Sequence, residues 1–201
     1  MTGCLIAFEG GEGSGKSTQA ARLAKRIGAV LTREPGGTPL GERIRSVVLD
    51  PSIGVVDPRA EALLMAAARA QHVADVIEPA LARGEVVVTD RYIGSSLAYQ
   101  GHGHGLDVDD LVTLSHWATD GRPADLVVLL TVPSEVAATR LQRPTDRMER
   151  LGKRFHKRVA EGFAELAARD ADRWVVVDGV GEIHEVAARV DAAYDAWKRT
   201  R

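Results

Sequence analysis

Apolar and polar residues follow two patterns along the chain. Short apolar runs of strand length occupy residues 4–8, 29–32, 86–89, 126–132 and 174–177. Runs of this kind are typical of strands buried on both faces of a parallel sheet. The segments between them carry apolar residues at every third or fourth position, which predicts helices. We therefore predict an α/β fold, with a parallel sheet of about five strands and helices on both faces.

Capping residues, glycines and prolines set the expected helix boundaries. The first expected helix begins at Lys16, and the second follows a cap at Thr38. Further helices are expected over residues 61–83 and 107–118, from Ser134 towards Arg143, and from Ile183. In the long helix over residues 61–83, Leu63, Ala67 and Ala70 mark the face expected to pack against the core. Residues 101–105 hold two histidines between three glycines. We expect a flexible, solvated loop there, because the sequence offers no third metal ligand nearby.

Length and composition indicate one globular domain spanning residues 1–201. Of the 201 residues, 45% are hydrophobic and 27% are charged, which suits a single α/β core. A formal net charge of -2 gives no sign of a nucleic-acid or membrane partner. Cys4 is the only cysteine, so an intramolecular disulfide is excluded. The sequence shows no signal peptide or membrane span, and we expect a cytoplasmic protein.

The most specific motif is Gly-Gly-Glu-Gly-Ser-Gly-Lys-Ser at residues 10–17. It matches the phosphate-loop pattern G-x-x-x-x-G-K-[ST] and stands between a predicted strand and a predicted helix, as that pattern requires. Its glycines let backbone amides face phosphate oxygens, and the helix start adds partial positive charge. Lys16 is expected to reach the β- and γ-phosphates, and the Ser17 hydroxyl to ligate Mg²⁺. The expected ATP-binding residues are Gly10, Gly11, Glu12, Gly13, Ser14, Gly15, Lys16, Ser17 and Thr18.

Two further polar segments suit a phosphate-transfer site. Asp90 and Arg91 follow the predicted strand over residues 86–89, and α/β sheets bind their ligands at the carboxyl ends of parallel strands. Residues 142–157 are dense in charged side chains. Such a run is ordinarily a solvated helix surface. In a phosphate-transfer protein, its arginines could instead close over a polyphosphate and exclude water.

The phosphate loop alone is compatible with a GTPase, a mechanical ATPase or a kinase. A GTPase normally carries an Asn-Lys-x-Asp guanine signature, and this chain has no asparagine. A motor or switch ATPase stays open, although the chain is short and offers no obvious second ATPase domain. A non-catalytic nucleotide-binding regulator is a further alternative. Such a regulator would not need the combination of Lys16, Asp90 and Arg91.

Five motifs in a fixed order resemble the bacterial thymidylate kinase family. They lie at residues 8–18, 32–38, 69–72, 90–92 and 95–101, and Asp146-Arg147-Met148-Glu149 resembles the family's lid. The resemblance implies a P-loop nucleoside monophosphate kinase fold with a lid at about residues 142–157, and a homodimer. It also implies transfer of the ATP γ-phosphoryl group to dTMP, with Mg²⁺, in dTTP biosynthesis.

The same resemblance assigns catalytic roles. Lys16 would hold the transferring phosphate, and Glu9 would contact the sugar 3′-hydroxyl and help to organise the magnesium environment. Asp90 would serve the metal through water, together with Ser17. Arg91 would clamp the acceptor phosphate, a role that suits the fork of a guanidinium group.

Members of the family carry their catalytic arginine either in the phosphate loop or in the lid. The loop between Gly10 and Lys16 contains no arginine, whereas the lid segment contains several. The chain therefore resembles the lid-arginine type. Arg147 and Arg143 are the candidates, ahead of Arg150 and Arg154.

The resemblance further implies a set of dTMP-binding residues. Arg33 and Arg45 would line the monophosphate pocket, and Arg69 would bind a thymine carbonyl. The full set is Glu9, Arg33, Arg45, Met65, Arg69, Arg91, Ser96, Tyr99 and Gln100. Within it, Ser96 and Gln100 would face the pyrimidine edge, and Tyr99 would pack beside the deoxyribose.

Met65 departs from the family pattern. Phenylalanine usually stands at this position and stacks on thymine, whereas methionine covers a base with less fixed geometry. A relative that acts on another deoxynucleotide or on a modified pyrimidine is therefore the nearest enzymatic alternative.

Overall fold

The computed structural model describes residues 3–141 and 146–200, and its strands form one parallel sheet. The strands are β1 (Cys4–Glu9), β2 (Val30–Arg33), β3 (Val86–Asp90), β4 (Leu126–Thr131) and β5 (Trp174–Asp178). Their spatial order is β2-β3-β1-β4-β5. In the central register, Ile6 lies opposite Val88 on one side and Leu126 on the other. The predicted α/β fold with a five-stranded parallel sheet is confirmed.

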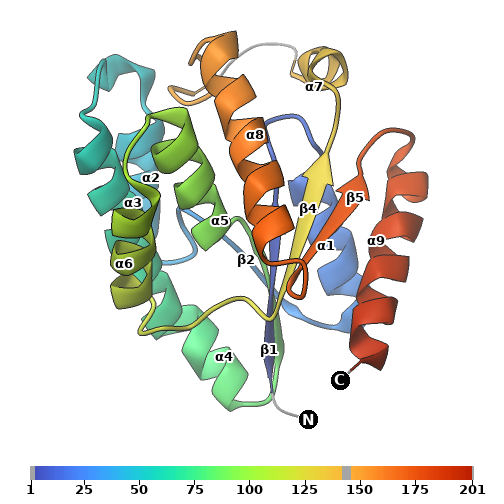
Figure 1. Cartoon of the computed structure of the whole chain (residues 1–201). Helices are drawn as coiled ribbons and strands as arrows, with labels where there is room; N and C mark the ends of the chain where they lie inside the picture. Colours follow the sequence, from blue (N-terminus) through green and yellow to red (C-terminus); the bar gives the residue numbers. More distant parts are fainter. Residues whose placement is uncertain (1–2, 142–145, 201) are drawn as a thin grey trace.

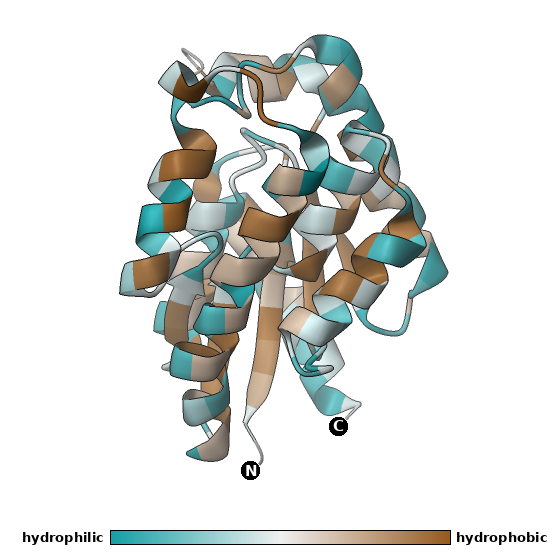
Figure 2. Cartoon of the chain, turned by 90° about the vertical axis from the view of Figure 1, so that its left-hand side faces the viewer, coloured by the Kyte–Doolittle hydropathy of each residue, from teal (hydrophilic) through white to brown (hydrophobic). Residues whose placement is uncertain are grey.

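Helices cover both faces of the sheet (Figure 1). On one face, α1 (Lys16–Ile27) and α9 (Ile183–Arg199) pack through Leu23 and Val190 against apolar strand residues. On the other face, Ile77 and Phe163 belong to the buried layer. The helices on that side are α2 (Pro39–Leu49), α3 (Pro58–His72), α4 (Glu78–Ala82), α5 (Ile93–Ser96), α6 (Val108–Ala118) and α8 (Lys153–Arg169). Figure 2 shows an apolar sheet between helices that carry both apolar and polar positions.

Two shorter elements lie outside these helices and strands. A 3-10 turn spans Pro51–Ile53, and α7 (Ser134–Arg140) follows β4. The predicted helix from Ser134 ends at Arg140, and Arg143 lies outside the described residues. No helix in the described ranges is long and apolar enough to span a membrane.

The long helix predicted over residues 61–83 consists of three consecutive segments. It begins earlier than predicted, at Pro58, because the Asp57 side chain caps the helix by accepting from the Arg59 N–H. The segment Val73–Ile77 then takes π-helical geometry before α4. Pro79 has no N–H to donate to the preceding turn, which favours an irregular helix at this point.

The inward face of α3 differs from the predicted one. Leu63 is 58% exposed and Ala67 is exposed, whereas Ala62, Ala66 and Arg69 are buried. The predicted packing of Leu63 and Ala67 against the core is therefore wrong. Alanines stand on several sides of this helix, so the spacing of apolar residues could not identify its buried face.

Residues 101–105 do not form the solvated loop that we predicted. A π-helical segment spans Leu97–Gly103, and both Gly101 and Gly103 are buried. A Cβ atom on Gly103 would lie 2.7 Å from the Phe155 ring, so glycine permits the close approach of α8. Helix α8 itself was not among the predicted helices, and its packing explains why this glycine-rich segment is ordered helix.

The carboxyl ends of three strands meet at one edge of the sheet. Arg33 at the end of β2 lies opposite Asp90 of β3, and Asp90 lies opposite Phe8 of β1. The phosphate loop follows β1 directly. The strand register therefore brings the loop, Arg33 and Asp90 to the same end of the molecule, where α/β sheets bind ligands.

Candidate active site

The phosphate loop connects β1 to α1 through close backbone contacts. Gly10 has a φ of 145°, and a Cβ atom there would overlap the carbonyl oxygen of Leu130. A side chain at this position is therefore excluded both by conformation and by space. Lys16 is 6% exposed, and its Nζ atom donates to the Gly11 carbonyl at 3.3 Å. Ser17 and Thr18 are exposed in the first turn of α1.

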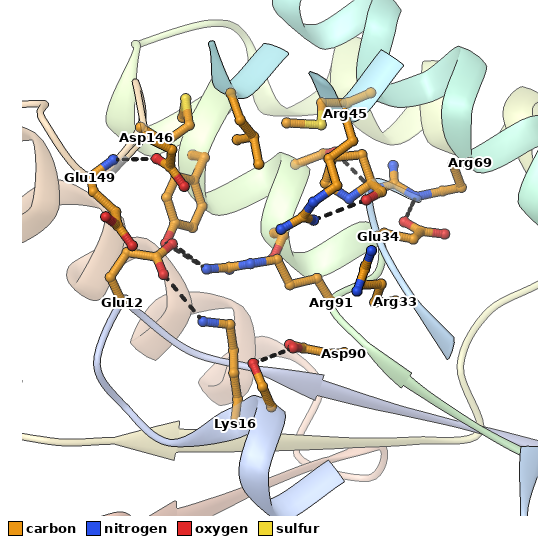
Figure 3. Close-up of a pocket in the computed structure, with 18 of the residues that line it drawn as sticks. Glu12, Lys16, Arg33, Glu34, Arg45, Arg69, Asp90, Arg91, Asp146 and Glu149 are labelled. Carbon is orange, nitrogen blue, oxygen red and sulfur yellow. Dashed lines mark hydrogen bonds and ion pairs between the residues drawn. The ribbon is translucent and has the colours of Figure 1, made fainter. Parts of the chain in front are cut away.

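A partly buried cluster of charges joins this loop to the end of β3. The Arg91 guanidinium donates to the Glu12 carboxylate, to the Gly10 carbonyl at 3.2 Å and to the Tyr99 hydroxyl at 3.1 Å. Lys16 Nζ lies 3.6 Å from the other Glu12 oxygen (Figure 3). Arg91 also has a φ of 74°, which is uncommon for a residue with a side chain. The fold thus holds Arg91 in an unusual conformation directly beside the phosphate loop.

The charges of this cluster depend on one another. Burial by itself raises the pKa of Glu12, but Arg91 and Lys16 lower it to about 2. Burial, and then the Arg91 charge, lowers the pKa of Lys16 below its ordinary value. Although burial acts in the opposite direction, the Glu12 carboxylate raises the pKa of Arg91. Two adjacent cations beside a glycine-rich loop form a site with high affinity for phosphate oxygens.

Ser17 and Asp90 form an oxygen site at the entrance to α1. The Ser17 hydroxyl donates to Asp90 Oδ2, while Asp90 Oδ1 is buried without a hydrogen-bond partner among the described residues. No cluster of three or more His, Cys, Asp or Glu residues able to hold a metal occurs in residues 3–141 and 146–200. Magnesium commonly binds to one or two protein oxygens together with water and phosphate oxygens. The Ser17 and Asp90 oxygens therefore fit Mg²⁺.

One cavity of about 370 Å³ extends from this loop towards α3. It contains most of the residues that the sequence predicts for substrate binding. The predicted site residues that line it are Glu12, Lys16, Ser17, Arg33, Arg45, Met65, Arg69, Asp90, Arg91, Ser96, Tyr99 and Gln100. The cavity has cations along its walls and an apolar part at Met65 and Leu49, so it suits an anionic ligand with a flat apolar portion.

Arg33 and Arg45 line the cavity from β2 and α2. Arg33 donates to both carboxylate oxygens of Glu42, at 3.1 and 3.0 Å. Arg45 Nη1 donates to the Pro35 carbonyl at 3.0 Å. Burial, and then the neighbouring Arg33 charge, lowers the pKa of Arg45 below its ordinary value. Two arginines held close together in this way favour an anion between them.

Arg69 is oriented by a buried network at the far end of the cavity. Its Nε atom donates to Glu34 at 2.7 Å, and Nη2 donates to the Tyr92 carbonyl and to Ser96 Oγ, each at 3.0 Å. His72 Nδ1 lies 2.9 Å from the second Glu34 oxygen. Sequence reasoning noted the motifs that contain Glu34 and His72 but gave neither residue a role. Glu34 bonds directly to the predicted base-binding arginine, and His72 contacts that arginine's partner Glu34.

Glu9 is placed differently from the expectation that it contacts a sugar. It is completely buried, and Oε1 accepts from the backbone N–H groups of Tyr92 and Ser95, each at 3.0 Å. Oε2 accepts from Ser95 Oγ at 2.6 Å. Glu9 is not among the residues that line the cavity, whereas Glu12 is. In this structure, Glu9 holds the turn after β3.

Burial raises the pKa of Glu9 to about 7, against its hydrogen bonds from Ser95 and the Arg91 charge, both of which act to lower it. Because the folded-state pKa is raised, this group's contribution to stability is full below about pH 4.5 and is lost as the pH rises to about 7. Ionisation should cost on the order of 3 kcal/mol. A Glu9→Gln variant should lack this pH dependence. Urea unfolding of both proteins at about pH 5 and pH 8 measures the difference, and parallel pH profiles would contradict it.

The lid segment contributes side chains that sequence reasoning did not select. Asp146, Met148 and Glu149 line the cavity. Arg147 instead donates from Nε to the Val48 carbonyl at 2.8 Å and from Nη2 to Glu61. It is 8% exposed and does not contact the phosphate loop. The other candidate, Arg143, lies outside the described residues.

Arg140 is an arginine near the phosphate loop that the sequence did not single out. Its Nη1 atom donates to the Gly13 carbonyl at 3.3 Å, and Nη2 donates to the Gly179 carbonyl at 3.0 Å. It stands at the last position of α7, just before the lid segment. The feature of the sequence that could have identified Arg140 is its position near the end of a predicted helix, next to the charged run over residues 142–157.

Comparisons with known proteins agree with this geometry. A family model described as thymidylate kinase matches residues 8–190. The thymidylate kinase of Bifidobacterium longum subsp. infantis is 46% identical over 200 residues, which cover 96% of this chain and 86% of that protein. The thymidylate kinase of Pelotomaculum thermopropionicum is 48% identical over 186 residues, covering 89% of this chain and 86% of that protein.

A solved structure gives the same result for the fold. The crystal structure of thymidylate kinase from Ehrlichia chaffeensis matches with a TM-score of 0.80 at 29% identity, covering 96% of this chain and 100% of that chain. The family resemblance predicted from the ordered motifs is thus confirmed. The chain, with its phosphate loop and cation-lined cavity, belongs to the thymidylate kinase family of phosphoryl-transfer enzymes.

Proposed function

We propose that the chain phosphorylates dTMP to dTDP with the γ-phosphoryl group of ATP, as a step of dTTP biosynthesis in the cytoplasm. One observation carries this proposal. A single cavity joins the phosphate-loop residues Lys16 and Ser17 to the residues Arg69 and Gln100 at its far end. A donor phosphate and an acceptor base can therefore occupy the two ends of one site, with the acceptor phosphate between them.

Phosphoryl transfer requires alignment and charge neutralisation rather than a covalent intermediate. An oxygen of the acceptor phosphate attacks the γ-phosphorus, and the bond from that phosphorus to the oxygen of the leaving ADP breaks. Lys16 neutralises charge on the transferring group from the donor side. Arg91 holds the acceptor phosphate, with Arg33 and Arg45 on the adjoining wall. Both ends of the reaction are then fixed by side chains that other contacts already orient.

We assign Mg²⁺ to the oxygens of Ser17 and Asp90. When bound there, it supplies positive charge to the phosphate oxygens of ATP. Asp90 is well suited to this role because one of its oxygens is buried without a partner in the described chain. Ser17 presents its hydroxyl from the first turn of α1, next to the lysine that contacts the same phosphates.

We assign residues 142–157 to a lid over this cavity, within a single domain of residues 1–201. Asp146, Met148 and Glu149 support this assignment because they already line the cavity. Arg147 and Arg143 remain our candidates for the catalytic arginine. Arg147 would have to leave its contacts with Glu61 and Val48 to reach a phosphate, so its catalytic use requires a rearrangement of the lid.

The function is tested by ADP formation from ATP and Mg²⁺ with dTMP, dUMP, dCMP, dGMP, AMP or no acceptor. Turnover that depends on dTMP is expected. Some turnover with dUMP is also expected, since a hydrophobic contact discriminates one methyl group by only about 1–3 kcal/mol. Turnover with a different acceptor alone would favour the alternative deoxynucleotide kinase. Hydrolysis without an acceptor would favour an ATPase, and nucleotide binding without turnover a regulator.

Replacing Met65 with phenylalanine should leave dTMP binding at least as tight and can strengthen it by about 1 kcal/mol. Met65 lines the apolar part of the cavity, and an aromatic ring would give a flatter, more rigid surface for a base. Calorimetric titration with dTMP measures the effect. Leu40→Phe is the control, because Leu40 is 47% exposed on α2. Clear weakening in Met65→Phe would show that this side chain does not cover the base.

We further propose a homodimer formed through α3 and α6. These helices pack against each other (Figure 1), and they expose Leu63, Val112 and Trp117, the last at 81%. Large exposed apolar residues on neighbouring helices are typical of an association surface. Trp117→Glu should shift the protein to a monomer in sedimentation equilibrium. Val55→Glu, at a fully exposed loop position, should not. A dimer that is equally stable in both variants would rule out this surface.

A further inference from the structure

Glu61 is a buried carboxylate in the first turn of α3 with no role in the reaction described above. Its side chain is 0% exposed. Oε1 accepts a hydrogen bond of 2.7 Å from Gln100 Nε2, and Oε2 accepts from Arg147 Nη2. His104 Nε2 lies 3.3 Å from Oε1 without completing a hydrogen bond. These three neighbours, which come from two different segments, converge on one carboxylate.

Glu61 is ionised in this environment. Burial by itself raises the pKa of its carboxyl group, but contacts with His104, Arg147 and Gln100 lower it below the ordinary value. An ionised carboxylate has no proton to donate and can only accept hydrogen bonds. Its partner on Gln100 must therefore be the amide NH₂ group.

This restriction fixes the orientation of the Gln100 amide. The amide oxygen and nitrogen look alike in outline, and in most sites either can face a given direction. Beside Glu61, only the nitrogen can form the 2.7 Å bond. The oxygen is then the amide atom left to accept a hydrogen bond, and Gln100 lines the cavity. Gln100 thus presents a hydrogen-bond acceptor to a base.

Arg69 presents the complementary group. Among the described residues, its hydrogen bonds engage Nε and Nη2, and none engages Nη1. A guanidinium nitrogen can only donate. The far end of the cavity therefore offers one fixed donor from Arg69 and one fixed acceptor from Gln100.

This donor and acceptor pair distinguishes two classes of pyrimidine. Thymine and uracil have a carbonyl acceptor at position 4 and an N–H donor at position 3. Cytosine has an amino donor at position 4 and an acceptor at position 3, so it mismatches both groups. A site that leaves buried polar groups unpaired with the wrong ligand can discriminate strongly.

We infer that Glu61 is a positioning residue for base selectivity. By accepting a hydrogen bond from Gln100 Nε2, it leaves the Gln100 amide oxygen to accept a hydrogen bond from an N–H group at position 3 of the base. This inference rests on the proposed function, since it concerns how the acceptor base is chosen. Glu61 itself does not touch the substrate. It acts through the single bond that it makes to Gln100.

Glu61→Gln and Glu61→Asp form a matched pair of variants. Glutamine keeps the size of the side chain but supplies its own NH₂ group, so the Gln100 amide can turn over. Aspartate changes the size but remains only an acceptor. The readout is the ratio of kcat/KM for dUMP to that for dCMP. These two nucleotides differ only at positions 3 and 4 of the base.

The ratio should fall by about tenfold or more in Glu61→Gln and stay within about threefold of the wild type in Glu61→Asp. Both variants disturb the contact with Arg147, so general damage to the fold would affect them alike. An unchanged ratio in Glu61→Gln, or an equal fall in both variants, would overturn the inference. A wild-type protein that phosphorylates neither dTMP nor dUMP would instead refute the proposed function, and the inference with it.

Glu61→Gln also leaves the buried Arg147 without its anionic partner, which can be strongly destabilising. If that variant does not fold, the substitution is made together with Arg147→Gln and compared with Arg147→Gln alone. The dUMP to dCMP ratio is taken within one protein, so any loss of overall rate from Arg147 cancels. The ratio should again fall by about tenfold, and an equal ratio in the two proteins would overturn the inference.

Discussion

Lys16→Ala should lower kcat for dTMP phosphorylation by about 10²–10³-fold, a loss of ~3–4 kcal/mol in transition-state stabilisation. Lys16 is the only lysine of the phosphate loop, and its Nζ atom is held by the Gly11 carbonyl at 3.3 Å and by Glu12 at 3.6 Å. Alanine removes the positive charge that the γ-phosphoryl group needs as it leaves ADP. No other lysine or arginine can take this position from the same helix turn.

The fold should tolerate this change. Burial lowers the pKa of Lys16, which means that the charged lysine costs free energy in its present position. Glu12 keeps Arg91 as a partner after the substitution. Steady-state ADP release and a thermal melt are measured together. Lys25→Ala, at an exposed position of the same helix, is the control and should retain full activity. Full phosphoryl transfer by Lys16→Ala would show that the loop has a different role.

Arg91→Ala should weaken dTMP binding by about 10²-fold or more, ~3 kcal/mol, and ATP binding by much less. Arg91 lines the cavity where the acceptor phosphate is proposed to bind. Its guanidinium fork can pair with two phosphate oxygens at once. The effect should therefore fall on the monophosphate, because donor-phosphate contacts come mainly from the loop amides and Lys16.

Arg91 also pairs with the partly buried Glu12, so removing one partner of this pair should make the alanine variant less stable. Binding of dTMP and of ATP is therefore titrated separately, at a temperature where a melt shows the variant to be folded. Arg91→Lys keeps the charge without the fork and should show an intermediate loss. Arg83→Ala, which removes an exposed pair with Glu85, is the control. Unchanged dTMP affinity in Arg91→Ala would remove this residue from the acceptor site.

The parts of the site that the sequence predicts are those encoded by neighbouring residues. The phosphate loop is one continuous motif, and its strand and helix flank it directly. Asp90 and Arg91 follow an apolar strand, and the rule for parallel sheets places them at the ligand-binding edge. Local sequence was sufficient in these cases because the chain itself connects the functional group to the element that positions it.

The roles of Glu34 and Glu61 could not be predicted in this way. Each bonds to a partner far away along the chain, 35 residues in the bond from Arg69 to Glu34 and 39 residues in the bond from Gln100 to Glu61. A buried carboxylate and an exposed one look the same in a sequence. Helix α8 was missed for a different reason: its first turn belongs to the charged run that we interpreted as a lid, although Phe155, Val159 and Phe163 recur at every fourth position.

The direct succession of Asp90 and Arg91 has a consequence for how the two nucleotides are aligned. One residue belongs to the proposed metal side and the next to the acceptor side, and their Cα atoms are joined by a single peptide unit of about 3.8 Å. The backbone positions that carry the proposed metal ligand and the proposed acceptor-phosphate ligand are therefore fixed relative to each other at the end of β3. Closure of the proposed lid would change access to the site and its water content, but it would leave these two backbone positions unchanged relative to each other.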